Sequence, residues 1–170
     1  MSTRPARRSP HPVSTLTLHL PDAQATSRTG AALATCLRGG MIVTLHGELG
    51  SGKTTLVRGL LRARGVAGPI KSPTYSLVEH YPVSRLDFYH FDFYRFTSPD
   101  EWESAGMSDH FRDDAVCIVE WPERVAGLLP VADLALSLSY AAGGGRDLVA
   151  ESNTGEGARC VSALRAMPSR

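Results

Sequence analysis

The segment Gly47-Glu48-Leu49-Gly50-Ser51-Gly52-Lys53-Thr54 decides the fold of this chain, because it matches the phosphate-binding pattern G-x-x-x-x-G-K-[ST] without a gap. Its glycines let the backbone curl so that N–H groups point inward at a triphosphate. Lys53 adds a positive charge for the outer phosphates, and Thr54 can give its hydroxyl to Mg²⁺. We therefore expect ATP and Mg²⁺ as ligands. The residues expected to bind the nucleotide here are Gly50, Ser51, Gly52, Lys53, Thr54 and Thr55.

The flanks of this loop have the character that the motif requires. Residues 41–45 form a short apolar run rich in strand-forming side chains. Residues 55–64 place Val57, Leu60 and Leu61 on one face of a helix, whose positive dipole end would face the phosphates. A chance glycine-rich turn is the alternative, and the order of strand, loop and helix disfavours it.

The rest of the chain alternates between strand and helix patterns. The predicted fold is α/β, a P-loop NTPase with a central, mostly parallel sheet flanked by helices and extended by antiparallel strands. Asp22 is expected to cap a helix, Pro82 to mark a turn between two strands, and Ser98-Pro99-Asp100-Glu101 to form a capping box. The expected strands are 14–20, 41–45, 74–81, 86–91, 115–119, 134–140 and 146–151, and the expected helices are 23–37, 55–64, 99–105 and 158–167.

Composition limits the partners of the protein. Its 170 residues are 42% hydrophobic and 21% charged, which is ordinary for a globular domain. Eighteen basic and seventeen acidic residues give a net charge of +1, so no overall field favours nucleic acid or an anionic membrane. Between residues 79 and 123, eleven acids face only three arginines, so strong direct binding of tRNA by this region is not expected.

Cysteines and termini indicate the compartment. Cys36, Cys117 and Cys160 lie far apart without a C-x-x-C pair, so we expect buried, reduced thiols in a cytoplasmic protein. No apolar run approaches the roughly 18 residues of a membrane span. Residues 1–13 are basic and proline-rich without an acid, which indicates a disordered tail, with a transit peptide as the alternative. Residues 14–170 then form a single domain.

Two carboxylates follow buried strands and are candidates for catalysis. Glu120 ends the apolar run 116–119, and Asp92 ends the run 88–91. A carboxylate at the carboxyl end of a buried strand is where phosphoryl-transfer enzymes hold their metal and orient water. The alternative is that each acid simply marks the end of a strand. We expect Asp92, Glu120 and Lys53 to be catalytic, and Thr54 and Glu120 to hold the metal.

Four motifs in order resemble the bacterial TsaE (YjeE) ATPases. They are the loop 47–55, then Ser72-Pro73-Thr74-Tyr75, then His90-Phe91-Asp92-Phe93-Tyr94-Arg95, then Glu120-Trp121-Pro122-Glu123. The resemblance covers roughly residues 16–151. It implies a small ATPase required for N6-threonylcarbamoyladenosine at position 37 of tRNAs that read ANN codons. It also implies binding to the heterodimer of the transferase subunit TsaD and its inactive paralogue TsaB, which ATP hydrolysis resets. Because the sequence has no evident arginine lid to close the nucleotide site, we expect low activity in isolation.

The resemblance also adds roles for individual residues. Ser72 and Thr74 are candidates for a switch segment that senses the γ-phosphate, although the residues alone also fit an ordinary turn. Trp121 is a candidate for the nucleotide or partner surface, or for simple core packing. Gln24 and Arg146 match family positions that flank the base and sugar of the nucleotide.

Two other functions fit the same loop. A small-molecule or nucleotide kinase would need an acceptor pocket and an arginine-bearing lid, for which only Arg112 and Arg124 are placed. A nucleotide-sensing adaptor would bind ATP to dock a partner with little turnover, and it needs the same loop and metal.

Overall fold

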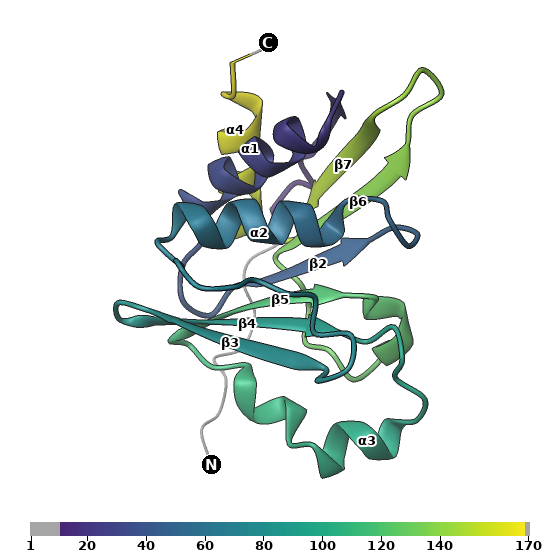
Figure 1. Ribbon diagram of the computed structural model, residues 1–170. Helices are drawn as coiled ribbons and strands as arrows, with labels where there is room; N and C mark the ends of the chain where they lie inside the picture. The colour runs from purple at the N-terminus through teal and green to yellow at the C-terminus, as the bar shows by residue number, and fades with distance from the viewer. Residues whose placement is uncertain (1–10, 169–170) are drawn as a thin grey trace.

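A seven-stranded sheet forms the centre of the protein in the computed structural model, which describes residues 11–168 (Figure 1). The strand order is β1-β7-β6-β2-β5-β4-β3. The strands are β1 (Thr15–Leu20), β2 (Ile42–His46), β3 (Val78–Val83), β4 (Leu86–Asp92), β5 (Ala115–Glu120), β6 (Leu134–Tyr140) and β7 (Arg146–Ser152). The helices are α1 (Ala23–Ala34), α2 (Lys53–Ala63), α3 (Pro99–Ser104) and α4 (Gly155–Arg165), with 3₁₀ turns η1 (Met107–His110) and η2 (Pro122–Val125).

The middle of the sheet is parallel and its flanks are antiparallel. β2 pairs in parallel with β5 and β6, and β4 pairs in parallel with β5. β1, β3 and β7 join by antiparallel pairing. The predicted α/β class, with a parallel centre and antiparallel additions, is therefore confirmed. Because the parallel strands end at one edge, β2, β4 and β5 bring the phosphate loop, Asp92 and Glu120 to the same place.

Each face of the sheet is covered by a different layer. Helices α1, α2 and α4 cover one face, over a core that is mainly Leu, Val, Ile and Ala. On the other face, α3, η1 and η2 pack over a core rich in rings. Figure 1 shows α1 and α4 at one side of the sheet and α3 at the other. The central strands are buried on both sides, which explains their continuous apolar sequences.

Helix α1 packs directly against the nucleotide-loop helix α2. At Gly30 in α1, an added Cβ would meet the backbone of Leu56, and at Gly59 in α2 it would meet the backbone of Ser27. The two glycines therefore let the helix backbones touch. This contact fixes the direction of α2, and with it the direction of the loop that begins it.

The sequence misplaced one strand boundary and one turn. Residues 74–77, predicted as the start of a strand, form a turn instead, and Leu77 has a φ of 66°. Pro82, predicted at a turn, lies inside β3, and the connection falls at Ser84 with a φ of 58°. The physical reason is that β3 is an edge strand. On its open side no neighbouring strand needs a backbone N–H, so a proline, which has none, is tolerated there.

Helix ends agree with the predicted capping. Asp22 accepts a hydrogen bond from the backbone N–H of Ala25 at 2.7 Å, and Ser98 and Glu101 form the expected capping box. Helix α1 ends at Ala34, three residues before the predicted end, and α4 begins at Gly155, three residues before its predicted start. The turns η1 and η2 were not predicted. Residues 1–10 of the predicted basic tail lie outside the described residues.

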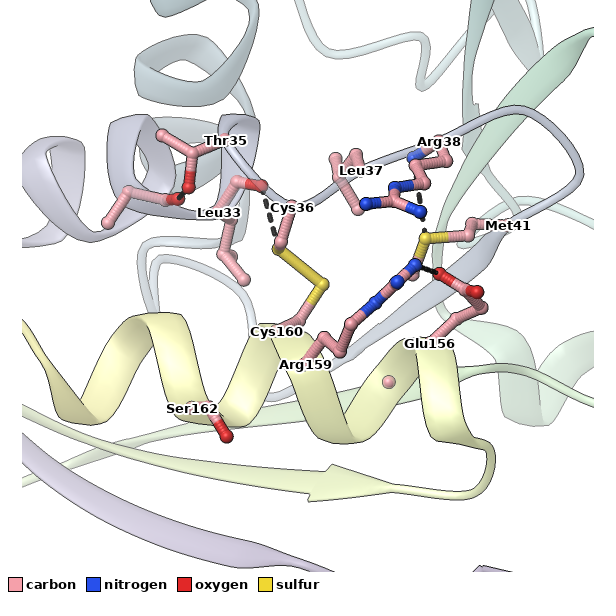
Figure 2. The surroundings of a disulfide bond; sticks show 12 residues. Leu33, Thr35, Cys36, Leu37, Arg38, Met41, Glu156, Arg159, Cys160 and Ser162 are labelled. Carbon is pink, nitrogen blue, oxygen red and sulfur yellow. Dashed lines mark hydrogen bonds and ion pairs between the residues drawn. A yellow bond between two sulfur atoms is a disulfide. The ribbon is translucent and has the colours of Figure 1, made fainter.

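The expectation of three reduced thiols is wrong for two of them. Cys36, just after α1, and Cys160, in α4, form a disulfide with Cα atoms 5.4 Å apart (Figure 2). The two cysteines are 124 positions apart in the sequence, which gave no indication that α1 and α4 pack side by side. Cys117 is free and buried, and desolvation raises the pKa of its thiol to about 12.

Within residues 11–168, no helix is long and apolar enough to cross a membrane.

Candidate active site

The loop between β2 and α2 depends on its glycines. Gly52, the residue before α2, has a φ of 106°, which side chains with a Cβ rarely adopt. At Gly47, an added Cβ would collide with the carbonyl oxygen of Leu138 and the hydroxyl of Ser51. Both observations explain why the pattern requires glycine at these two positions.

The donors of this loop fit a phosphate chain. The N-terminus of α2 has no side-chain cap. Its first backbone N–H groups therefore have no side-chain acceptor and can bind an anion. Ser51 is buried, and its hydroxyl has no hydrogen-bond partner anywhere in residues 11–168. A buried hydroxyl without a partner is costly, and a phosphate oxygen would satisfy it. The chemistry of these donors therefore matches an anionic ligand.

Lys53 lies inside the curl of the loop. Its Nζ donates to the carbonyl oxygens of Gly47 at 2.6 Å and Glu48 at 2.9 Å, and it lies 4.5 Å from the centre of the Trp121 ring. Desolvation lowers the pKa of Lys53, while the nearby carboxylates, Glu120 first, oppose that shift. The loop thus holds a positive charge beside the donors that face a phosphate.

Glu120 and Thr54 meet at the first turn of α2. Glu120 ends β5, is only 3% exposed, and its Oε1 accepts a hydrogen bond from the Thr54 hydroxyl at 3.1 Å. The same oxygen lies 2.8 Å from Nε2 of His90. A hydroxyl and a carboxylate oxygen are the ligand types that Mg²⁺ takes in nucleotide sites. The two predicted metal ligands are therefore adjacent and of suitable chemistry.

Asp92 binds the segment that precedes β3. Its Oδ2 accepts hydrogen bonds from the hydroxyls of Ser72 at 2.9 Å and Thr74 at 3.2 Å, and its Oδ1 accepts from the backbone N–H of Tyr94 at 2.9 Å. The register pairs Asp92 with Glu120, so both carboxylates face the same edge. The two candidate switch residues are thus tied to one candidate catalytic residue.

These side chains line one cavity of about 200 Å³. Its wall contains the predicted loop, carboxylate and hydroxyl residues together with Trp121. Trp121 has a φ of 58°, a left-handed conformation that is unfavourable for a bulky side chain, and such strain is found most often at functional sites. Tyr94, which the sequence analysis did not select, also lines this cavity and lies against Trp121.

A second cavity of about 220 Å³ continues from the loop toward α1. It shares Gly50, Gly52 and Thr55 with the first cavity. Arg146 lines it, donates to the Gly50 carbonyl at 3.1 Å and lies 4.1 Å from the Tyr140 ring.

Two predicted nucleotide contacts differ in how they face this second cavity. Gln24 is exposed on the first turn of α1 and does not line the cavity, whereas its neighbours Ala23 and Thr26 do. Tyr140 has no sequence motif that would have identified it, because only the fold brings its hydroxyl to the Leu49 carbonyl, to which it donates at 3.1 Å.

The arginines that a kinase lid would need are placed differently. Arg112 donates to Asp87 at 2.8 Å and to Asp114 at 2.9 Å. Asp87 lies at the amino end of β4, opposite the edge that carries Asp92. Arg124 lies 5.9 Å from the Tyr94 ring at the rim of the site. Arg112 is therefore engaged away from the nucleotide loop, which weakens the kinase alternative.

Comparison with known proteins gives consistent matches. The family described as "Threonylcarbamoyl adenosine biosynthesis protein TsaE" matches residues 20–148. A tRNA threonylcarbamoyladenosine biosynthesis protein TsaE of Haemophilus influenzae is 40% identical over 147 residues, covering 83% of this chain and 93% of that protein. The protein of the same name from Bacillus subtilis is 32% identical over 132 residues, covering 78% and 80%.

The fold also has a solved relative. The crystal structure of Bacillus subtilis YdiB superposes with a TM-score of 0.75 at 24% identity, over 91% of this chain and 97% of that chain. At this identity the likeness shows the fold, and it agrees with the α/β architecture described above.

Proposed function

Because this chain belongs to the TsaE family of tRNA threonylcarbamoyladenosine biosynthesis proteins, we propose that it is the ATP-hydrolysing subunit of that modification. One observation carries the proposal: a phosphate-binding loop, a hydroxyl and two buried carboxylates line a single cavity at the carboxyl edge of the sheet. The reaction is hydrolysis of ATP to ADP and phosphate, by a protein whose residues 14–170 form one ATPase domain.

Each side chain has a defined part in this proposal. The loop N–H groups, Ser51 and Lys53 bind the phosphates and neutralise charge. Thr54 and Glu120 hold Mg²⁺, which when bound neutralises charge that develops on the phosphates. Asp92 orients the attacking water or the hydroxyls of Ser72 and Thr74 that face it.

The network around Asp92 supports a switch that reports the nucleotide to a partner. Ser72 and Thr74 precede β3, and their hydroxyls bond to Asp92 and to each other. A change at the γ-phosphate would reach this segment through Asp92. We propose that the partner is the TsaD–TsaB heterodimer, that hydrolysis resets it, and that tRNA is not bound strongly by this chain alone.

The test measures ADP release by the isolated chain and after addition of the TsaD–TsaB heterodimer. We expect slow turnover alone and faster turnover with the heterodimer, and tighter binding of the heterodimer in one nucleotide state, because linkage is reciprocal.

Lys53→Ala should weaken ATP binding about a hundredfold at an unchanged melting temperature, because the lysine acts on phosphate charge. No turnover with or without the heterodimer would favour the nucleotide-sensing adaptor, and phosphate transfer to an acceptor would favour the kinase.

A further inference from the structure

A histidine outside the predicted site lies directly behind one of its carboxylates. His90 is in β4 and is completely buried. It precedes Asp92 by two residues, so both side chains project from the same face of the sheet. On this face α2 packs, and the neighbouring strand β5 carries Glu120. The sequence analysis selected Asp92 from this motif and assigned no role to His90.

The ring of His90 makes one hydrogen bond. Its Nε2 lies 2.8 Å from Glu120 Oε1, while Nδ1 is buried without a partner within residues 11–168. An ionised carboxylate only accepts, so Nε2 is the donor in this hydrogen bond. A buried polar nitrogen without a partner is unfavourable, and an apolar side chain would fill this core position at lower cost. The bond to Glu120 is therefore what the histidine contributes here.

Two donors from different elements hold the same oxygen of Glu120. His90 reaches Oε1 from the sheet, and the Thr54 hydroxyl reaches it from the first turn of α2. None of the hydrogen bonds within the described part of the chain involves Oε2, which leaves that oxygen for a metal or a water molecule. The position of Oε2 depends on how firmly Oε1 is held, because the carboxylate turns as one plane.

We propose that His90 is a positioning residue, which fixes the carboxylate of Glu120 so that its second oxygen meets Mg²⁺. The proposal rests on the proposed function, because it assigns a metal to Glu120. When a metal binds and Thr54 turns its hydroxyl toward it, the histidine remains as the donor on Oε1. Removing such a donor behind a metal ligand reduces metal affinity or activity about 10- to 100-fold in other metal sites.

The chain contains a matched control pair on the same hairpin. Nε2 of His80 lies 2.7 Å from Asp87 Oδ1, with the same chemistry as the pair of His90 and Glu120. This second pair is partly exposed. Its carboxylate, Asp87, lies near the amino end of β4, whereas the loop lies at the carboxyl ends of the parallel strands. His80→Phe removes a histidine–carboxylate bond of the same kind without touching the nucleotide cavity.

The experiment compares three variants of His90 that differ in where they place a donor. Gln carries its amide nitrogen three bonds from Cβ, as Nε2 does, whereas Asn carries it two bonds from Cβ, as Nδ1 does. Phe keeps a ring and removes both nitrogens. For each variant, calorimetry gives the ratio of ADP affinity with and without Mg²⁺, and a phosphate assay with the heterodimer gives kcat and KM.

We expect His90→Asn and His90→Phe to lower kcat and the Mg²⁺-dependent gain in ADP affinity about tenfold or more. His90→Gln should recover both values to within about threefold, and His80→Phe should match the parent protein. In the Glu120→Gln background, His90→Phe should lower turnover no further, because the group that it positions is already changed.

Equal values for the Gln and Asn variants, or additive losses in the double variant, would overturn the proposal and leave His90 as a packing residue. Gln and Asn are both small and polar, so this comparison stands even if His90→Phe fails to fold. If the parent protein hydrolyses no ATP with any partner, the proposed function fails. The Mg²⁺ dependence of ADP affinity then still decides the role of His90, since it requires no turnover.

Discussion

The face of the sheet beneath α1, α2 and α4 is packed with aliphatic side chains, whereas the face beneath α3, η1 and η2 is packed with rings. The strand alternation assigns His90, Asp92 and Glu120 to the aliphatic face, and Phe91, Phe93 and Val119 to the aromatic face. Lys53 and Thr54 also come from the aliphatic side, on α2. From the aromatic side, Trp121 lines the cavity and contacts Tyr94. The difference teaches that one layer holds the chemistry and the other chiefly supports it.

Truncation on the aromatic face should have the largest effect, and on stability alone. Trp102 in α3 is 2% exposed, packs on Phe93 and Phe111, and donates to the Ser108 hydroxyl at 2.8 Å. We expect Trp102→Ala to lower the free energy of unfolding by about 3–5 kcal/mol, because it leaves a large cavity. Urea unfolding and ADP titration measure the two quantities. A comparable loss of ADP affinity in the folded variant would show that the faces do not act separately.

Reduction of the disulfide should have the next largest effect, on the aliphatic side. The bond between Cys36 and Cys160 joins segments 124 residues apart. Its loss raises the conformational entropy of the unfolded chain. We expect reductant to lower the free energy of unfolding by about 2–4 kcal/mol. Cys36→Ser should be as unstable as the reduced parent and insensitive to reductant, whereas Cys117→Ala should keep the response. Identical unfolding curves with and without reductant would contradict the expectation.

Changing the carboxylates should affect turnover and spare metal-free nucleotide binding. Glu120→Gln and Asp92→Asn keep the shape of each side chain and remove its charge. We expect each to bind ADP as the parent protein does in the absence of Mg²⁺, and to lower Mg²⁺-dependent hydrolysis about a hundredfold, or ~2.7 kcal/mol in activation free energy. Phosphate release and ADP calorimetry separate the two effects. Parent rates in both variants would place the metal and the water elsewhere than on the aliphatic face.

Lowering the pH should produce the smallest effect, a decrease in the free energy of unfolding that arises from His110 on the aromatic face. Burial lowers the pKa of His110 below its ordinary 6.5, with the charge of Arg112 adding to the shift and Asp109 opposing it. The unfolded chain therefore binds this proton more tightly, so stability is complete above about pH 6.5 and falls as the pH decreases below it. The ring lies 4.6 Å from that of Tyr89. The slope of unfolding free energy against pH below 6.5 should be shallower in His110→Phe, and an unchanged slope would assign it to other groups.

Local sequence signals predicted most of the elements and the centre of the site. The loop, the caps at Asp22 and Ser98, and the strand-end acids Asp92 and Glu120 depend on neighbouring residues, so the sequence contains them directly. The turn at 74–77, the strand position of Pro82 and the disulfide depend on tertiary context instead. His90 illustrates what local signals cannot predict. Its proposed role depends on a carboxylate 30 residues away, which only the strand register brings beside it.

The position of Pro82 on β3 also bears on how the protein behaves at high concentration. An edge strand presents unpaired backbone groups that can recruit a strand from another molecule, which is a route to aggregation. β3 forms one end of the sheet, and Pro82 lies inside it. A proline has no N–H and disfavours continuous pairing along that edge. The residue that misled the prediction of a turn thus protects the open side of the sheet from self-association.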